Sequence, residues 1–257
     1  MTDETPFTIL VTGATGAIGG ALARHYASPG VHLILQGRDS KKLNQVAQAC
    51  RAAGAQVSDT SLDLANRSLL TGWLDSLLAC STPDLVFANA GMNTDTGPQQ
   101  QGENWEATEQ LLELNVRSTL YLAHRMAQAM RGQGRGQLVL ISSLAGWFGL
   151  PVTPAYSASK AAVKAYGEGI RGWLEGSGAS VTVVMPGYVN SAMCQAMPGP
   201  KPFLWQPEKA ARMIAKKVAA RRARVSFPFP LNWGCWWLAV LPAGLSHRLV
   251  RLFGYGD

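Results

Sequence analysis

A tyrosine and a lysine four residues apart could together carry out acid–base chemistry. They are Tyr156 and Lys160, in the segment YSASK, and Pro154 just before them marks a helix start. Residues four apart lie on one face of a helix, so the phenol and the ammonium converge. A phenol with a pKa of about 10 exchanges protons poorly at neutral pH, and a neighbouring ammonium favours its ionised form. The pair could act in acid–base catalysis, although this spacing also occurs on ordinary amphipathic helices.

A glycine-rich segment, TGATGAIGG at residues 12–20, follows a β-rich run and precedes a helical one. Glycines at such a turn let the backbone approach a pyrophosphate, whose charge then lies against the free N–H groups of the helix. A plain tight turn can have the same composition. The position between the first strand and the first helix is the one that a dinucleotide-binding fold requires, so the segment predicts a dinucleotide site.

The end of the second predicted strand indicates which dinucleotide is bound. Its sequence, LQGRD at residues 35–39, has Gly37 and Arg38 where an NAD site would have a carboxylate for the ribose hydroxyls. Gly37 leaves space there, and the Arg38 guanidinium could bind a 2′-phosphate. Arg38 could instead be a solvated loop residue beside Asp39. We expect NADP(H) to be preferred over NAD(H).

Short apolar runs alternate with longer segments of helical period along the chain. The runs predict buried strands at residues 8–12, 31–36, 56–62, 84–88, 137–142, 180–185 and 224–227. Helices are predicted at residues 18–28, 41–53, 67–79, 105–131, 154–175 and 207–220. This alternation predicts an α/β fold, a Rossmann-like doubly wound parallel sheet of about seven strands with helices on both faces. We expect residues 1–257 to form a single domain.

Composition excludes several classes of protein. Of the 257 residues 47% are hydrophobic and 15% charged, which is typical of a globular chain with a sizeable core. The four cysteines form no C-x-x-C pair, so neither a metal site nor a disulfide framework is expected. The acidic N-terminus lacks the parts of a signal peptide, so we expect a cytoplasmic protein. Ten of the 23 Lys and Arg lie after residue 200, and this local charge does not predict nucleic-acid binding.

Further motifs stand around the Tyr156 and Lys160 pair. Ser143 lies thirteen residues before Tyr156, and Asn115 lies in the predicted helix 105–131. The chain also has Asp-Leu at residues 63–64, Asn-Ala-Gly at 89–91 and Pro-Gly at 186–187. In this order and at these spacings, from about residue 8 to 191, the set resembles the short-chain dehydrogenase/reductase superfamily, in its shorter single-domain branch. The resemblance implies an NAD(P)-dependent oxidoreductase that acts on CH–OH and C=O groups.

The resemblance also implies roles for individual residues. Tyr156 would exchange the proton with the substrate oxygen, Lys160 would lower the Tyr156 pKa and hold the nicotinamide ribose, and Ser143 would bind the substrate oxygen. Asn115 would fix a water that connects Lys160 to solvent, unless it is only a helix-kink residue, and Ser142 could be mistaken for Ser143. The residues expected to bind the cofactor are Gly13, Thr15, Gly16, Ala17, Ile18, Gly19, Arg38, Asp63, Leu64, Asn89, Ala90, Gly91, Tyr156, Lys160, Pro186, Gly187, Val189 and Ser191. Two of them depart from the family pattern: Ala17 replaces a common glycine, and Ser191 a common threonine.

The segment after the sixth predicted strand is expected to select the substrate. Residues 192–206 contain three prolines, two methionines and a tryptophan, which suits an irregular lid with an adaptable apolar face. We expect substrate contacts from Ser143, Trp147, Met193, Met197 and Trp205, and therefore a small hydrophobic carbonyl or alcohol rather than a sugar. The same apolar residues could simply pack the lid onto the body.

Residues 225–257 form an apolar and basic C-terminal arm. No charged residue lies between Arg224 and Arg248, and this span holds Trp233, Trp236 and Trp237. Prolines interrupt the apolar run, which argues against a transmembrane span. The arm could be an anchor peripheral to an anionic membrane surface, assisted by the basic residues 209–224, or a subunit interface of a homodimer or homotetramer.

Two functions from different classes follow from these observations. The first is an NADP(H)-dependent carbonyl reductase that interconverts a hydrophobic ketone, such as a lipid-like or 3-oxoacyl compound, and its secondary alcohol. The second is a catalytically silent NADP-binding scaffold or sensor protein. The complete set of Asn115, Ser143, Tyr156 and Lys160 favours the enzyme.

Overall fold

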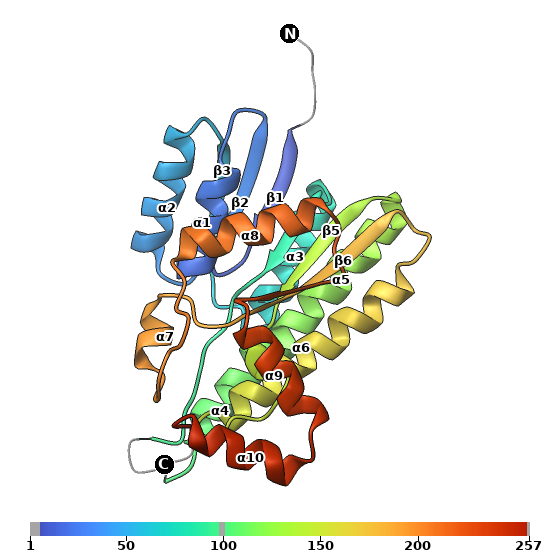
Figure 1. Ribbon diagram of the computed structural model, residues 1–257. Helices are drawn as coiled ribbons and strands as arrows, with labels where there is room; N and C mark the ends of the chain where they lie inside the picture. Colours follow the sequence, from blue (N-terminus) through green and yellow to red (C-terminus); the bar gives the residue numbers. More distant parts are fainter. Residues whose placement is uncertain (1–5, 98–100, 256–257) are drawn as a thin grey trace.

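The computed structural model of the chain describes residues 6–97 and 101–255. Its centre is one parallel sheet with the strand order β3-β2-β1-β4-β5-β6-β7 (Figure 1). The strands are β1 (Phe7–Val11), β2 (Val31–Gly37), β3 (Gln56–Ser61), β4 (Leu85–Ala88), β5 (Gly136–Ile141), β6 (Ala179–Pro186) and β7 (Arg224–Phe227). The predicted Rossmann-like α/β fold with seven strands is confirmed.

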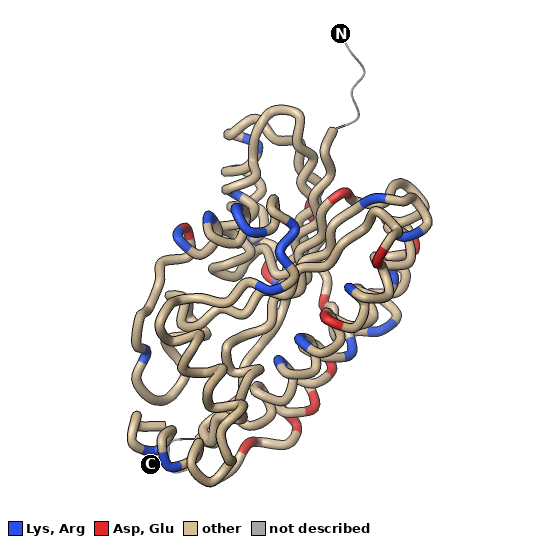
Figure 2. The backbone as a smooth tube through the Cα atoms, turned by 45° about the vertical axis from the view of Figure 1, so that its right-hand side comes forward, with Lys and Arg blue, Asp and Glu red and all other residues tan. Residues whose placement is uncertain are grey.

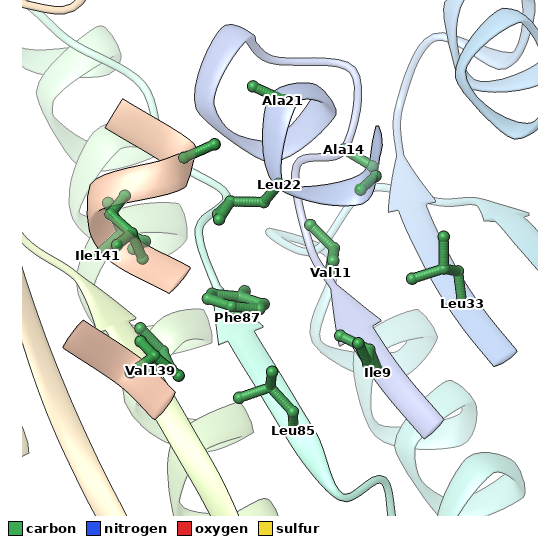
Figure 3. Close-up of a cluster of buried hydrophobic side chains, with 14 of the residues drawn as sticks. Ile9, Val11, Ala14, Ala21, Leu22, Leu33, Leu85, Phe87, Val139 and Ile141 are labelled. Atoms are coloured by element: carbon green, nitrogen blue, oxygen red, sulfur yellow. The ribbon is translucent and has the colours of Figure 1, made fainter. Parts of the chain in front are cut away.

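Helices cover both faces of the sheet (Figure 1). One layer contains α1 (Ala17–Tyr26), α2 (Ser40–Ala52) and α8 (Pro207–Ala219), and the other contains α3 (Arg67–Cys80), α5 (Thr119–Gln133) and α6 (Pro154–Trp173). The central strands are mostly apolar because successive side chains point to opposite faces and both faces are buried. Figure 3 shows the first layer, where Leu22 of α1 lies beside Phe87 of β4, while Leu10 belongs to the core on the opposite face.

The strand order reverses between β1 and β4, which are neighbours in the sheet. The chain leaves β1 toward β2 and β3 on one side, and it leaves β4 toward β5, β6 and β7 on the other. The connections at this point diverge beyond the carboxyl ends of the strands and leave a crevice there. The glycine-rich turn after β1 lies at this crevice.

The predicted helix 105–131 consists of three segments. After α4 (Trp105–Leu112) comes a π-helical segment, η1 (Glu113–Ser118), and then α5. The widened turn needs other partners for its carbonyl groups, and hydroxyls supply them: Ser118 Oγ donates to Glu113 O at 2.8 Å, and Thr119 Oγ1 donates to Leu114 O at 3.2 Å. Asn115 lies inside this π-helical segment, as such distortions often do at functional sites.

The segments after β6 fold back over the carboxyl edge of the sheet. The predicted lid, residues 192–206, contains one short helix, α7 (Ala192–Ala196), and returns to the body at Trp205, whose N–H donates to Tyr188 O at 2.9 Å. The C-terminal arm forms two helices, α9 (Leu231–Val240) and α10 (Ala243–Leu252), drawn in dark red in Figure 1. Among the described residues, no helix is both long enough and apolar enough to span a bilayer.

Candidate functional site

A cleft of about 1080 Å³ opens at the switch point of the sheet. Most of the residues expected to bind the cofactor line it: Gly13, Thr15, Gly16, Ala17, Ile18, Arg38, Leu64, Asn89, Ala90, Gly91, Tyr156, Lys160, Pro186, Gly187, Val189 and Ser191. Ser143, Met193 and Met197 line it as well. Five of the expected site residues do not line the cleft: Gly19, Asp63, Asn115, Trp147 and Trp205. Their contacts are described below.

The glycine-rich turn has no room for side chains. Gly13 has a φ of +64°, and a Cβ there would lie 2.8 Å from the Cα of Ala90. A Cβ on Gly19 would lie 2.3 Å from Gly13 O, so Gly19 lets the helix pack against the turn rather than facing the cleft. Asn89 ties the turn to β4, because its Nδ2 donates to Thr12 O at 3.0 Å and to Gly13 O at 3.2 Å.

The start of α1 fits the diphosphate of a dinucleotide. Gly16 is its N-cap, no side chain caps the helix, and its first turn has no acidic residue. The unpaired N–H groups of a helix N-terminus bind anions, and Ala17 and Ile18 of this turn line the cleft. The methyl group of Ala17, the departure from the family pattern, is accommodated in the first turn of α1.

Gln36, which the sequence analysis did not single out, holds this turn in place. The side chain is buried in β2, where its Oε1 accepts from the N–H of Gly13 at 3.1 Å. Its Nε2 donates to Leu62 O at 2.8 Å. A polar residue inside the apolar strand VHLILQG was the signal that could have revealed it.

Arg38 stands at the edge of the cleft beyond β2. Its side chain is exposed and makes no ion pair with any described residue. Asp39 does not neutralise it, because its Oδ1 accepts from the N–H of Lys42 at 3.0 Å, which helps to keep the pKa of Asp39 low. A Cβ on Gly37 would lie 2.7 Å from Thr15 Cγ2, so glycine keeps this corner open. Asp63 accepts from the N–H of Ala65 at 3.0 Å, and Leu64 lines the cleft in its place.

Tyr156 and Ser143 meet inside the cleft. Burial raises the pKa of the Tyr156 phenol, and a hydrogen bond with the Ser143 hydroxyl opposes this rise. Ser143 Oγ also accepts from the N–H of Ala145 at 3.2 Å, in the short helix η2 (Leu144–Gly146). Ser142 faces elsewhere, because its hydroxyl donates to Lys160 O at 2.7 Å in the core. The Ser142 hydroxyl is therefore engaged in the core, and the Ser143 hydroxyl is the one that affects the pKa of Tyr156.

Lys160 is buried beneath this pair. Its Nζ donates to Ile141 O at 3.0 Å and lies 5.6 Å from the centre of the Tyr156 ring. Burial lowers the pKa of Lys160 to about 8. The ammonium form still predominates at neutral pH, so a positive charge lies close to the phenol.

Asn115 and Lys160 approach the same side of Gly91. A Cβ on Gly91 would lie 3.1 Å from Asn115 Oδ1 and 3.5 Å from Lys160 Nζ, so a glycine leaves room there for both side chains. Asn115 Oδ1 accepts from the N–H of Met92 at 2.8 Å, and its Nδ2 donates to Met92 O at 2.8 Å. These bonds join the π-helical segment to the loop after β4.

A second residue that the sequence analysis missed, Glu103, lies at the start of α6, the helix that contains Tyr156 and Lys160. Its carboxylate accepts from the backbone N–H of Ala155 and from the hydroxyl of Thr94, both at 2.9 Å. The N-cap residue of α6, Thr153, makes no side-chain cap, so Glu103 supplies an acceptor from another segment. No local motif reveals this contact, because 52 residues separate its partners.

Two of the expected substrate contacts have other surroundings. Trp147 packs against Leu144 and Met185, with Lys164 Nζ 4.8 Å and Arg224 4.6 Å from its ring. Trp205 stacks on Phe227 with ring centres 4.9 Å apart. Both side chains thus pack against other parts of the protein, outside the walls of the cleft.

The C-terminal segment forms one wall of the cleft. The contributing residues, which the sequence analysis did not place there, are Leu231, Trp233, Gly234, Cys235, Trp237, Leu238, Leu241, Leu249, Val250, Phe253 and Tyr255. The uncharged run between Arg224 and Arg248 was the available signal. Tyr255 fastens this wall, since Tyr188 Oη donates to Tyr255 Oη at 2.7 Å and Tyr255 Oη donates to Pro200 O at 2.6 Å.

Comparisons with known proteins agree with this geometry. Residues 7–200 match the family model for short chain dehydrogenases. An uncharacterized oxidoreductase of Myxococcus xanthus (strain DK1622) is 34% identical over 245 residues, which are 95% of this chain and 96% of that protein. The NADP-dependent 3-hydroxy acid dehydrogenase YdfG of Salmonella typhi is 27% identical, over 95% of this chain and 93% of that protein.

A solved structure extends the likeness to the three-dimensional fold. It is a short-chain dehydrogenase from Sphingobium yanoikuyae in complex with NADPH, 26% identical, with a TM-score of 0.81 over 96% of this chain and 95% of that one. The parallel sheet, the glycine-rich turn at its switch point and the tyrosine–lysine pair are thus accompanied by similarity over nearly the whole chain. The chain belongs to the short-chain dehydrogenase/reductase superfamily of NAD(P)-dependent oxidoreductases, which act on CH–OH and C=O groups.

Proposed function

We propose that the chain is an NADP(H)-dependent carbonyl reductase that interconverts an apolar ketone and its secondary alcohol. The observation that carries the proposal is that Tyr156 and Ser143 line one cleft, with the buried Lys160 Nζ 5.6 Å from the Tyr156 ring. The outer wall of this cleft consists of uncharged residues. The Ser143 and Tyr156 hydroxyls lie together in that cleft and can both bind a carbonyl oxygen.

Each side chain has a definite task in this proposal. Bound nicotinamide supplies or accepts the hydride. Tyr156 donates its phenolic proton to the oxygen of the ketone, and the Ser143 hydroxyl hydrogen-bonds the same oxygen as negative charge develops there. Lys160 favours the phenolate that remains, and Asn115 would hold a water through which the proton is replaced.

NADP(H) is preferred in this proposal because of the surroundings of the adenosine end. Arg38 is exposed at the cleft edge without an ion-pair partner among the described residues, and the adjacent residue, Asp39, caps α2. A guanidinium there attracts a 2′-phosphate, whereas a ribose diol gains little from it. The NADP-dependent relative YdfG and the NADPH complex from Sphingobium yanoikuyae support this choice.

The proposed substrate is lipid-like or a 3-oxoacyl compound, because Met193, Met197, Trp237 and Phe253 offer an apolar channel and no charged partner. The experiment is NADPH oxidation by the purified chain, followed by absorbance, against 3-oxoacyl esters of increasing length and against sugars. We expect kcat/KM to rise with chain length and sugars to be inert. Tight NADPH binding without turnover of any ketone would instead support the silent scaffold.

A further inference from the structure

Several exposed apolar side chains lie on the two C-terminal helices and just before them. We call them the hairpin surface, and its members are Phe229, Trp236, Val240, Leu245 and Leu252. Leu252 is 81% exposed and Phe229 75% exposed. None of the five lines the cleft, so substrate binding does not explain them. Apolar groups gathered in this way usually mark a docking surface.

Helix α9 is apolar on every side. Its sequence, LNWGCWWLAV, has no charged residue, and none of its residues is buried. A helix that is apolar all round is ordinarily covered on all sides by protein or lipid. One side of α9 lines the cleft, and its other side is exposed. A further apolar partner would be needed to cover that exposed side.

The hairpin surface is continuous with the mouth of the cleft. Trp233, Trp237 and Phe253 line the cleft and are at the same time half or more exposed. On the lid, Phe203 also lines the cleft and is more than half exposed, and Met193 lines it and is 39% exposed. Whatever covers the hairpin surface therefore also faces the entrance.

The charges that the two C-terminal helices themselves carry are of one sign. Arg248 and Arg251 of α10 are exposed and make no ion pair with a described residue. No Asp or Glu occurs from residue 209 to residue 255. In Figure 2 blue positions lie beside the C-terminal marker, at the end of the molecule that α9 and α10 form. The surface is thus suited to an anionic partner.

The basic residues 209–224 do not belong to this surface. They lie on and after α8, which packs against α1 and is well separated from α10 in Figure 1. Arg224 forms an ion pair with Glu168. Any partner of the hairpin surface must be recognised by the cations of α10, and the expected joint action of residues 209–224 with the tryptophans does not fit the fold.

We propose that the hairpin surface docks on an anionic lipid bilayer and turns the cleft mouth toward the lipid. Indole and aliphatic groups enter the interface, while Arg248 and Arg251 face the headgroups. A second copy of the chain fits less well, because the C-terminal helices of that copy contain no carboxylate that could pair with Arg248 and Arg251. The docking itself is independent of the enzyme's reaction, but direct uptake of a ketone from the bilayer rests on the proposed function.

The test is flotation of the full-length protein with two kinds of vesicle, phosphatidylcholine alone and phosphatidylcholine mixed with phosphatidylglycerol. We expect flotation only with the second kind, and less of it at high salt. The double variant Val240→Glu with Leu252→Glu should lower the bound fraction at least tenfold. The double variant Arg248→Gln with Arg251→Gln should lower the partition coefficient between vesicle and water, because each cation contributes about fivefold.

Trp173→Ser is the matched control. Trp173 is an exposed tryptophan at the last residue of α6, whereas α10 lies beside the first two turns of that helix. Nineteen residues of helix separate Trp173 from Pro154, about 28 Å, so this variant should float like the wild type. Flotation unchanged by the Glu pair, or no flotation at any salt, would overturn the proposal.

Two further readouts keep the outcomes separate. The Glu pair should still bind NADPH, measured by fluorescence, and should still oxidise it with a short water-soluble ketone, because neither residue lines the cleft. Flotation without any turnover would retain the docking and reject the proposed function. A wild type that does not float and forms a dimer that the Glu pair dissociates would reject the lipid partner in favour of a second copy.

Discussion

The carboxylate of Glu103 accepts a hydrogen bond from the backbone N–H of Ala155, at 2.9 Å from Oε2 and 3.2 Å from Oε1. Ala155 directly precedes Tyr156 in the first turn of α6. A carboxylate at a helix N-terminus is stabilised by the unpaired N–H groups and by the helix dipole. The position of the proposed proton donor thus depends on a residue from the loop before α4.

Replacing Glu103 by Ala should loosen the start of α6. We expect the free energy of unfolding to fall by about 1–2 kcal/mol, as for the loss of a helix cap. We also expect kcat to fall about tenfold or more, because small misplacements of catalytic groups are costly. NADPH binding should stay near wild type. Urea unfolding and steady-state kinetics measure both effects, with the exposed Glu106→Ala as control; a variant with normal kcat would show that Glu103 is only structural.

Replacing Tyr156 by Phe should nearly abolish turnover. The change removes the proposed proton donor and its contact with Ser143 but leaves the cofactor surface almost unaltered. General acid catalysis contributes about 10²–10⁴-fold, so kcat should fall by at least that factor. NADPH titration by fluorescence should give a Kd within about threefold of wild type, well under 1 kcal/mol. Retention of a tenth of the wild-type kcat would contradict the mechanism.

Replacing Arg38 by Asp should change the cofactor preference. The variant replaces attraction by repulsion at the proposed 2′-phosphate site, and a charge-assisted contact is worth about 1.5–3 kcal/mol. The ratio of the Kd values for NADH and NADPH should therefore shift about a hundredfold toward NADH. Lys41→Asp, an exposed cation in the first turn of α2 outside the cleft, controls for net charge. Equal affinity of the wild type for both cofactors would reject the role of Arg38.

The buried Lys160 should make stability depend on pH above neutrality. Its pKa is lowered to about 8 in the folded chain, against an ordinary value of about 10.4 when unfolded. Between these values the unfolded chain binds the proton that the folded chain has lost, so this group's contribution to stability rises with pH. The free energy of unfolding of the wild type, relative to that of Lys160→Met, should therefore rise by about 2–3 kcal/mol from pH 7 to pH 10. Urea unfolding without cofactor measures this change. A constant difference would show that Lys160 titrates normally.

Local patterns were sufficient for the sheet and its helices. The strands are short and apolar because both faces of the sheet are covered, and this pattern is legible in ILV of β1 as in LVFA of β4. The helix 105–131 was predicted without its π-helical segment. That distortion depends on hydroxyl contacts of Ser118 and Thr119 and on the bond from Asn115 to the loop after β4, which periodicity does not encode.

The sequence by itself determined the family, the fold and the residues Ser143, Tyr156 and Lys160, because each of these depends on residue types at fixed spacings along one chain. Only the tertiary structure decided which side chains share a surface. It brought Glu103 to the start of α6, turned Trp147 and Trp205 away from the cleft and laid α9 across its mouth. These contacts join segments tens of residues apart, and packing between such segments is set by the shape of the folded core, not by any local pattern.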